Sequence, residues 1–114
     1  MSIELLQTVD IIEEMENFME NNRPTEDIRD QLDLSYKIED QSVIIYEIRP
    51  HWEKPGQMIE SNIAKATFVK TSGHWKIFWL RASLKWESYQ PTPAVKTLKE
   101  FLNIIEEDKH YCFW

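Results

Sequence analysis

The stretch that most constrains the fold lies at residues 63–86 and reads IAKATFVKTSGHWKIFWLRASLKW. Apolar and polar residues alternate on both sides of Ser72-Gly73, which is the pattern of two antiparallel strands joined by a tight turn. A two-residue turn at this point sets Phe68 opposite Ile77. The stretch holds three of the five tryptophans, so it predicts a hairpin at the centre of a sheet that is buried on one face.

A second hairpin is predicted at residues 32–49. Apolar residues alternate with polar ones up to Ile38, and the run VIIYEIR follows a turn at Asp40-Gln41. A two-residue turn there sets Tyr36 opposite Ile45. The two faces of this hairpin depend on that register, because a slip of one residue would exchange them.

Helical patterns lie on either side of the two hairpins. Residues 3–22 have apolar residues at helical spacing, and Arg23-Pro24 ends that helix, because a residue before proline is pushed out of the α region. Thr92-Pro93 predicts the start of a second helix, since a capping residue is followed by proline at the first helical position. The buried stripe of this helix is expected to be Val95, Leu98, Leu102 and Ile105.

These elements predict an α+β fold. It is a two-layer sandwich, with a four- to five-stranded antiparallel sheet and with the N-terminal and C-terminal helices on one face. The fifth strand would be a short one at residues 84–89. A chain of 114 residues is near the commonest domain size, so we expect one domain over residues 1–114.

Charge is distributed unevenly along the chain, whose formal net charge is −7. Residues 1–40 hold 12 acidic and 3 basic residues, whereas residues 41–90 hold 4 acidic and 7 basic residues. An acidic total argues against a general polyanion binder, but the basic middle of the chain is also where the tryptophans lie. The single cysteine, the absence of a secretory pattern and the absence of a long apolar run favour a cytoplasmic protein that is not bound to a membrane.

Several short motifs of the sequence resemble those of a known family. They are RP, IRDQ, EIRP, AKATFVK, the run WKIFWLRASLKW and the closing Cys-Phe, and they lie between residue 23 and the C-terminus. Together they are similar to the bacterial family called domain of unknown function 3024, whose members are small single-domain proteins. The resemblance implies a bacterial cytoplasmic protein, and it implies no activity and no catalytic residue.

Three charged residues are candidates for a ligand site. Glu47 and Arg49 project from the predicted core face, and Arg81 reaches the same face from the other hairpin. A buried charge is unfavourable unless it is paired, so a structural ion pair is the simpler interpretation. The other interpretation is a polar pocket for a small anionic ligand.

Other kinds of chemical site have little support. Asp33 with Glu47 and Arg49 suggests a degenerate nuclease signature, but the predicted register points the two carboxylates to opposite faces. The soft metal ligands are His51, His74, His110 and Cys112, and they lack the short paired spacing of a zinc site. We therefore expect no metal and no cofactor, and no nucleophile motif identifies a catalytic residue or an enzyme.

The reverse face of the predicted sheet is the candidate contact surface, because both helices are needed on the other face. An antiparallel sheet commonly has one solvated face, but several large apolar residues there favour an interface, for a homodimer or a protein partner. The predicted interface residues are Ile44, Tyr46, Ile48, Phe78 and Leu80. The alternative is binding of single-stranded nucleic acid, or of a small anionic ligand, by the basic, tryptophan-rich residues 63–86, since lysines beside aromatic rings suit stacked bases.

Overall fold

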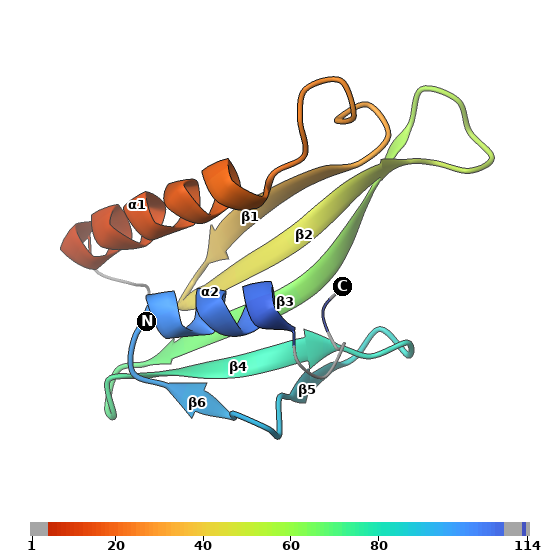
Figure 1. The fold of residues 1–114 in the computed structure, drawn as a ribbon. Coiled ribbons are helices and arrows are strands. Elements are labelled where there is room, and N and C mark those ends of the chain that lie inside the picture. Colours follow the sequence, from red (N-terminus) through yellow and green to blue (C-terminus); the bar gives the residue numbers. More distant parts are fainter. Residues whose placement is uncertain (1–4, 109–112, 114) are drawn as a thin grey trace.

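The computed structural model describes residues 5–108 and 113. Its elements in chain order are α1 (Leu5–Asn22), β1 (Asp33–Glu39), β2 (Ser42–Pro50), β3 (Met58–Val69), β4 (His74–Leu80), β5 (Trp86–Ser88), β6 (Ala94–Val95) and α2 (Leu98–Glu107) (Figure 1). The strands form one antiparallel sheet in the order β1-β2-β3-β4-β5, with β6 paired to β4. The predicted α+β class is confirmed, and the sheet has six strands instead of the four or five expected.

The first hairpin has the predicted register. Tyr36 pairs with Ile45 across β1 and β2, and the turn consists of Asp40 and Gln41. Asp40 has a φ of 51°, a left-handed conformation that aspartate tolerates better than most residues with a side chain. The predicted faces of this hairpin are therefore correct.

The second hairpin is displaced by two residues from its predicted register. Phe68 pairs with Trp75 instead of Ile77, because the connection spans residues 70–73 and is longer than a two-residue turn. Gly73 closes this loop with a φ of 69°, and its N–H donates to the carbonyl of Val69 at 2.8 Å. A shift of two residues preserves which side chains share a face, because side chains alternate along a strand with a period of two.

A β-bulge interrupts the pairing of β2 with β3. The register shifts between Ile45 and Tyr46, and Ile63 is the extra residue on β3. Ile63 and Ala64 consequently both belong to the buried core. Strict alternation along β3 from Lys65 would put Ile63 on the face opposite the helices, and the bulge is the reason that it lies in the core instead.

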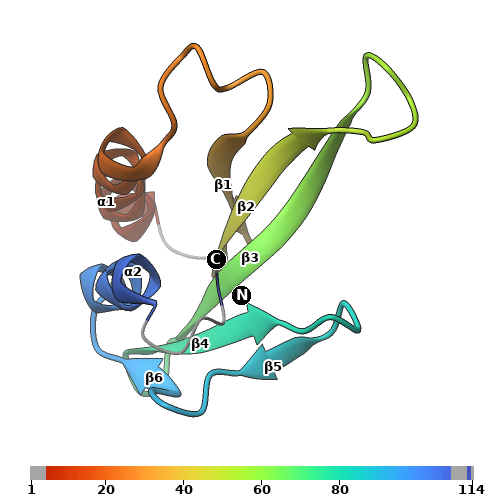
Figure 2. The ribbon, with the colours of Figure 1, turned by 45° about the vertical axis from the view of Figure 1, so that its right-hand side comes forward.

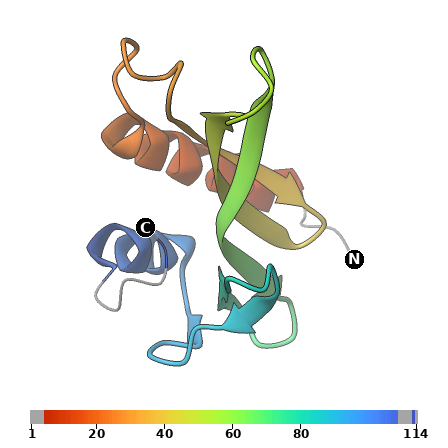
Figure 3. The ribbon, with the colours of Figure 1, turned by 90° about the vertical axis from the view of Figure 1, so that its right-hand side faces the viewer.

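Both helices pack against one face of the sheet, which curves around them (Figures 1, 2 and 3). The two helices run in the same direction beside each other. The residues of this core with no measurable exposure are Met15, Val43, Ile45, Ala64, Ala66, Ile77, Phe101 and Ile105. Neither helix of the described chain is long and apolar enough to cross a membrane.

The second helix begins later than predicted. Ala94 and Val95 pair with β4, and the N–H of Ile77 donates to the carbonyl of Pro93 at 2.9 Å, so this segment extends the sheet. The helix starts at Leu98, and the Thr97 hydroxyl accepts a hydrogen bond from the Glu100 N–H at 3.2 Å. The capping sequence Thr-x-x-Glu therefore defines the start, in place of Thr-Pro five residues earlier.

The buried stripe of α2 is partly as predicted. Leu98, Leu102 and Ile105 are buried on the helix together with Phe101, whereas Val95 is buried on β6. Beyond the helix, Phe113 is also buried.

Replacing the observed cap tests where α2 starts. Thr97→Ala should lower the free energy of unfolding by about 1 kcal/mol, because the first turn of α2 loses a hydrogen-bond acceptor. Thr92→Ala, at the cap predicted from sequence, is the matched control and should change stability by less than half as much. Urea unfolding followed by circular dichroism measures both. A larger effect at position 92 would contradict the observed helix start.

Candidate functional site

The face of the sheet opposite the two helices carries a mixture of lysine, acidic, aromatic and aliphatic residues, and we call it the open face. Its members follow from the cross-strand pairs, because paired residues in an antiparallel sheet project to the same side. They are Asp33, Ser35, Lys37, Glu39, Ser42, Ile44, Tyr46, Ile48, Glu60, Asn62, Lys65, Thr67, Lys76, Phe78, Leu80, Trp86 and Ser88. Both helices lie on the other side of the sheet (Figures 2 and 3).

The five predicted interface residues are all on the open face. Ile44 is buried, with 6% of its surface exposed, and the other four are half-buried. They form two groups, one on β2 and one on β4. Between the groups, β3 presents Glu60, Asn62 and Lys65. The apolar surface is therefore divided by polar residues and is less continuous than the strand pattern suggested.

Lys65 lies at the centre of the open face, between two aromatic rings. Its Nζ atom is 4.9 Å from the centre of the Phe78 ring and 4.8 Å from the centre of the Trp86 ring. Burial against these rings lowers the pKa of Lys65, and the charge of Glu39 opposes that shift. Three adjacent strands thus position one ammonium group over two π-faces, a geometry stabilised by the ring quadrupoles.

A second lysine is placed in a similar way. The Nζ of Lys37 lies 5.5 Å from the centre of the Tyr46 ring and 3.6 Å from Oε1 of Glu39. Lys76 adds a third positive charge on β4, and its side chain is exposed. The open face therefore combines three lysines with three aromatic rings, from Tyr46, Phe78 and Trp86, and the strand pairs place Asp33, Glu39 and Glu60 on the same face.

The predicted ligand residues form two separate ion pairs. Arg49 Nε donates to Glu47 Oε2 at 2.9 Å on β2, and Nε of Arg81, which follows β4, lies 3.1 Å from Oε2 of Glu87 on β5. The Glu47 side chain is 18% exposed, whereas both arginines are more than half exposed. Each arginine has its own acidic partner, which is the structural ion pairing that the sequence also allowed.

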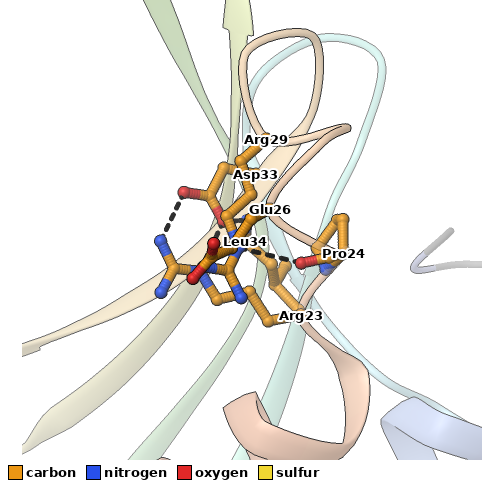
Figure 4. A network of polar contacts seen from close by, with 6 residues as sticks. All are labelled: Arg23, Pro24, Glu26, Arg29, Asp33 and Leu34. Atoms are coloured by element: carbon orange, nitrogen blue, oxygen red, sulfur yellow. Dashed lines mark hydrogen bonds and ion pairs between the residues drawn. The ribbon is translucent and has the colours of Figure 1, made fainter.

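A bidentate ion pair fixes the start of β1 to the end of α1 (Figure 4). Arg23 Nε donates to Asp33 Oδ1 at 2.7 Å, and a second guanidinium nitrogen donates to Oδ2 at 2.8 Å. Asp33 Oδ1 also accepts the Leu34 N–H at 2.7 Å. The hydrogen bonds from Arg23 lower the pKa of Asp33, while burial opposes the shift.

Asp33 and Glu47 line the same shallow pocket of about 240 Å³, although their strand positions face opposite ways. Both oxygens of Asp33 are occupied by Arg23, and Glu47 is paired with Arg49. The described residues contain no group of three histidine, cysteine or acidic side chains that would hold a metal ion. The two carboxylates therefore act as partners of arginine.

The histidines serve no common site in the described chain. His51 Nδ1 accepts the backbone N–H groups of Glu53 and Lys54, at 3.0 and 3.1 Å, and so orders the loop after β2. His74 begins β4. His110 and Cys112 lie outside the described residues.

Two aromatic residues stand out that the sequence pattern did not identify as site residues. Trp86 contributes a ring beside Lys65, and its pairing with Leu80 through β5 placed it there. Trp52 is 81% exposed in the loop that joins β2 to β3. The sequence does predict a fifth strand that contains Trp86, but the pattern does not assign the face of the sheet on which this side chain lies.

A scan against protein-family models matches the family described as a domain of unknown function, DUF3024, over residues 3–114. The match spans nearly the whole chain, so the protein belongs to this family. A search of the curated proteins and a search of the solved structures each found no match.

The Arg23–Asp33 pair makes a testable contribution to stability. Asp33→Asn should lower the free energy of unfolding at pH 7 by about 1 kcal/mol, because a bidentate pair exceeds most surface ion pairs. The pKa of Asp33 is lowered by folding, so its stabilisation is present above the unfolded value near 4 and is lost as pH falls through the folded value.

The difference between wild type and Asp33→Asn should therefore shrink as the pH of the urea-unfolding series falls from 7 to 3. Asp30→Asn removes an exposed acid from the same region and is the control. A difference that stays constant over this pH range would contradict the assigned role of the pair.

Proposed function

We propose that the protein is a binding module whose open face contacts single-stranded nucleic acid. The observation that carries the proposal is the position of Lys65, whose ammonium group lies within 5 Å of the ring centres of both Phe78 and Trp86. Aromatic rings accept stacked bases, and adjacent lysines neutralise phosphates. A flexible lysine stem can turn to a phosphate and leave both ring faces to bases.

The distribution of charge supports this proposal in spite of the acidic total. α1 carries five acidic and no basic residues, and α2 carries three acidic and one basic residue. The two helices together therefore account for a charge equal to the formal net charge of −7, and the rest of the chain is balanced.

The acidic helices also lie far from the proposed contact. A helix with its side chains is about 10 Å thick, which exceeds the Debye length of about 8 Å at physiological salt. Acids on the outer surface of the helices are thus screened from a ligand on the opposite face. The repulsion expected from the sequence alone is weakened by this two-layer arrangement.

A homodimer, or a complex with a protein partner, through Ile44, Tyr46, Ile48, Phe78 and Leu80 is the second candidate. The uncovered position of these five residues favours it. Their partial burial and the polar β3 residues between the two groups argue for a smaller apolar contact than a stable dimer uses.

A small anionic ligand held by Glu47, Arg49 and Arg81 has weaker support. Each arginine is already paired with an acid, and an anion would have to displace that carboxylate.

A cytoplasmic location, expected from the single cysteine, suits a nucleic-acid partner.

Fluorescence anisotropy of a labelled 12-nucleotide oligothymidine tests the proposal. Phe78→Ala and Trp86→Ala should each weaken binding at least fivefold, because base stacking on one ring contributes about 1–3 kcal/mol. Lys65→Gln should reduce the slope of log affinity against log salt by about 0.7, the value for one phosphate contact on a single strand.

Trp52→Ala is the control, because it removes an exposed tryptophan outside the open face. No binding by the wild type at 20 mM salt would contradict the proposal, and so would an equal loss in the Trp52 variant. Sedimentation equilibrium distinguishes the homodimer from the nucleic-acid proposal. A wild-type dimer that Phe78→Glu dissociates, in a protein that does not bind the oligonucleotide, would favour association through the open face.

A further inference from the structure

A second candidate surface lies on the opposite side of the molecule, between the two helices. Two hollows of about 360 and 400 Å³ run along this junction and meet at Glu14 and Lys99. They extend on α1 from Asp10 to Asn21, a distance of about 17 Å along a helix. We call this surface the helix groove.

The floor of the helix groove is apolar and its walls are polar. Buried side chains of the core form the floor, namely Ile11, Phe18, Trp75, Leu98 and Leu102. Asp10, Glu14, Asn17 and Asn21 line the α1 wall at spacings of four, three and four residues, which is one continuous helical stripe. Lys99, Asn103 and Glu106 line the α2 wall.

The amides in these walls match the chemistry of a peptide backbone. An asparagine side chain offers one acceptor and a two-hydrogen donor, so it can pair with both polar groups of a peptide unit. Asn17 and Asn103 lie within helices, where asparagine is less favourable than alanine. Asn22 closes one end of the groove by donating to Glu106 Oε1 at 2.9 Å.

The charge of the helix groove selects a cationic occupant. Asp10 and Glu14 take part in the backbone hydrogen bonds of α1, but within the described residues neither carboxylate forms a hydrogen bond or an ion pair. The helices run in parallel, so their negative C-terminal ends lie on the same side, and neither has a basic residue in its last turn. Lys99 offsets part of this charge, but Asp10, Glu14 and Glu106 also line the groove, so its net charge is negative and a basic partner would complement it.

We infer that the helix groove binds an extended peptide segment of a partner protein that carries lysine or arginine. A groove of about 17 Å accommodates roughly five residues of extended chain. Apolar side chains of the segment contact the floor, its backbone meets the asparagine amides, and its basic side chains approach Asp10 and Glu14. This inference is independent of the open face.

A phage-displayed library of random nine-residue peptides, selected on the full-length protein, tests the inference. Enriched peptides should carry lysine or arginine beside apolar residues. A fluorescein-labelled synthetic copy of the most enriched peptide should then lose at least tenfold in affinity on the double variant Asp10→Asn, Glu14→Gln, measured by anisotropy at 150 mM salt.

The double variant Glu13→Gln, Glu20→Gln is the matched control, because it removes the same charge from exposed positions of α1 outside the groove. Affinity within twofold of the wild type is expected for it. An equal loss in both double variants would overturn the inference, because it would reveal general attraction to an acidic helix. Enrichment of peptides without basic residues, or no enrichment, would also overturn it.

Discussion

The structure depends on the alternation of side chains along β3, the strand that pairs with β2 on one side and β4 on the other. Ala64 and Ala66 point to the helices and are fully buried, and their small size lets the helices approach the sheet. Lys65 lies between them in sequence and points to the open face, where it meets two aromatic rings. One short run of β3 therefore defines both layers of the molecule.

The bulge in β3 also determines the shape of the sheet. Ile63 and Ala64 both enter the core, so the alternation of the first half of β3 differs in phase from that of the second. A bulge increases local twist and bends its strand, and the sheet curves around the helices (Figure 2). This curvature buries the helices in the concave face and leaves lysines and aromatic rings on the other. The acidic helices and the open face are thereby separated by the thickness of the sandwich.

Features set by local chemistry could be predicted from sequence, whereas those set by distant pairing could not. The Asp40-Gln41 turn and the end of α1 near Pro24 follow from residues within a few positions of each other. The start of α2 was misplaced because Thr92-Pro93 and Thr97-x-x-Glu100 are both helix-start signals, and pairing of Ala94 and Val95 with β4 decides between them. The turn that ends at Gly73 is longer than predicted, and it shifts the pairing of β4 with β3 by two residues. Because side chains alternate with a period of two, the predicted faces of β4 are still correct.

The candidate site was predictable in composition but not in its contacts. The five apolar residues proposed from sequence do share the open face, since the alternation is correct. The role of Trp86 needs the β4–β5 pairing, and the partner of Arg81 is Glu87 for the same reason. The open face consequently has the character of an aromatic surface with charges of both signs more than that of an apolar one.

The proposed binding of single-stranded nucleic acid to the open face is tested most directly by mapping amide chemical shifts by NMR. Addition of a 12-nucleotide oligothymidine to the isotope-labelled protein should shift the amide signals of β3, β4 and β5 around Lys65, Phe78 and Trp86, and leave the outer surface of α1 unchanged. Shifts confined to the helices, or no shifts at low salt, would contradict the account.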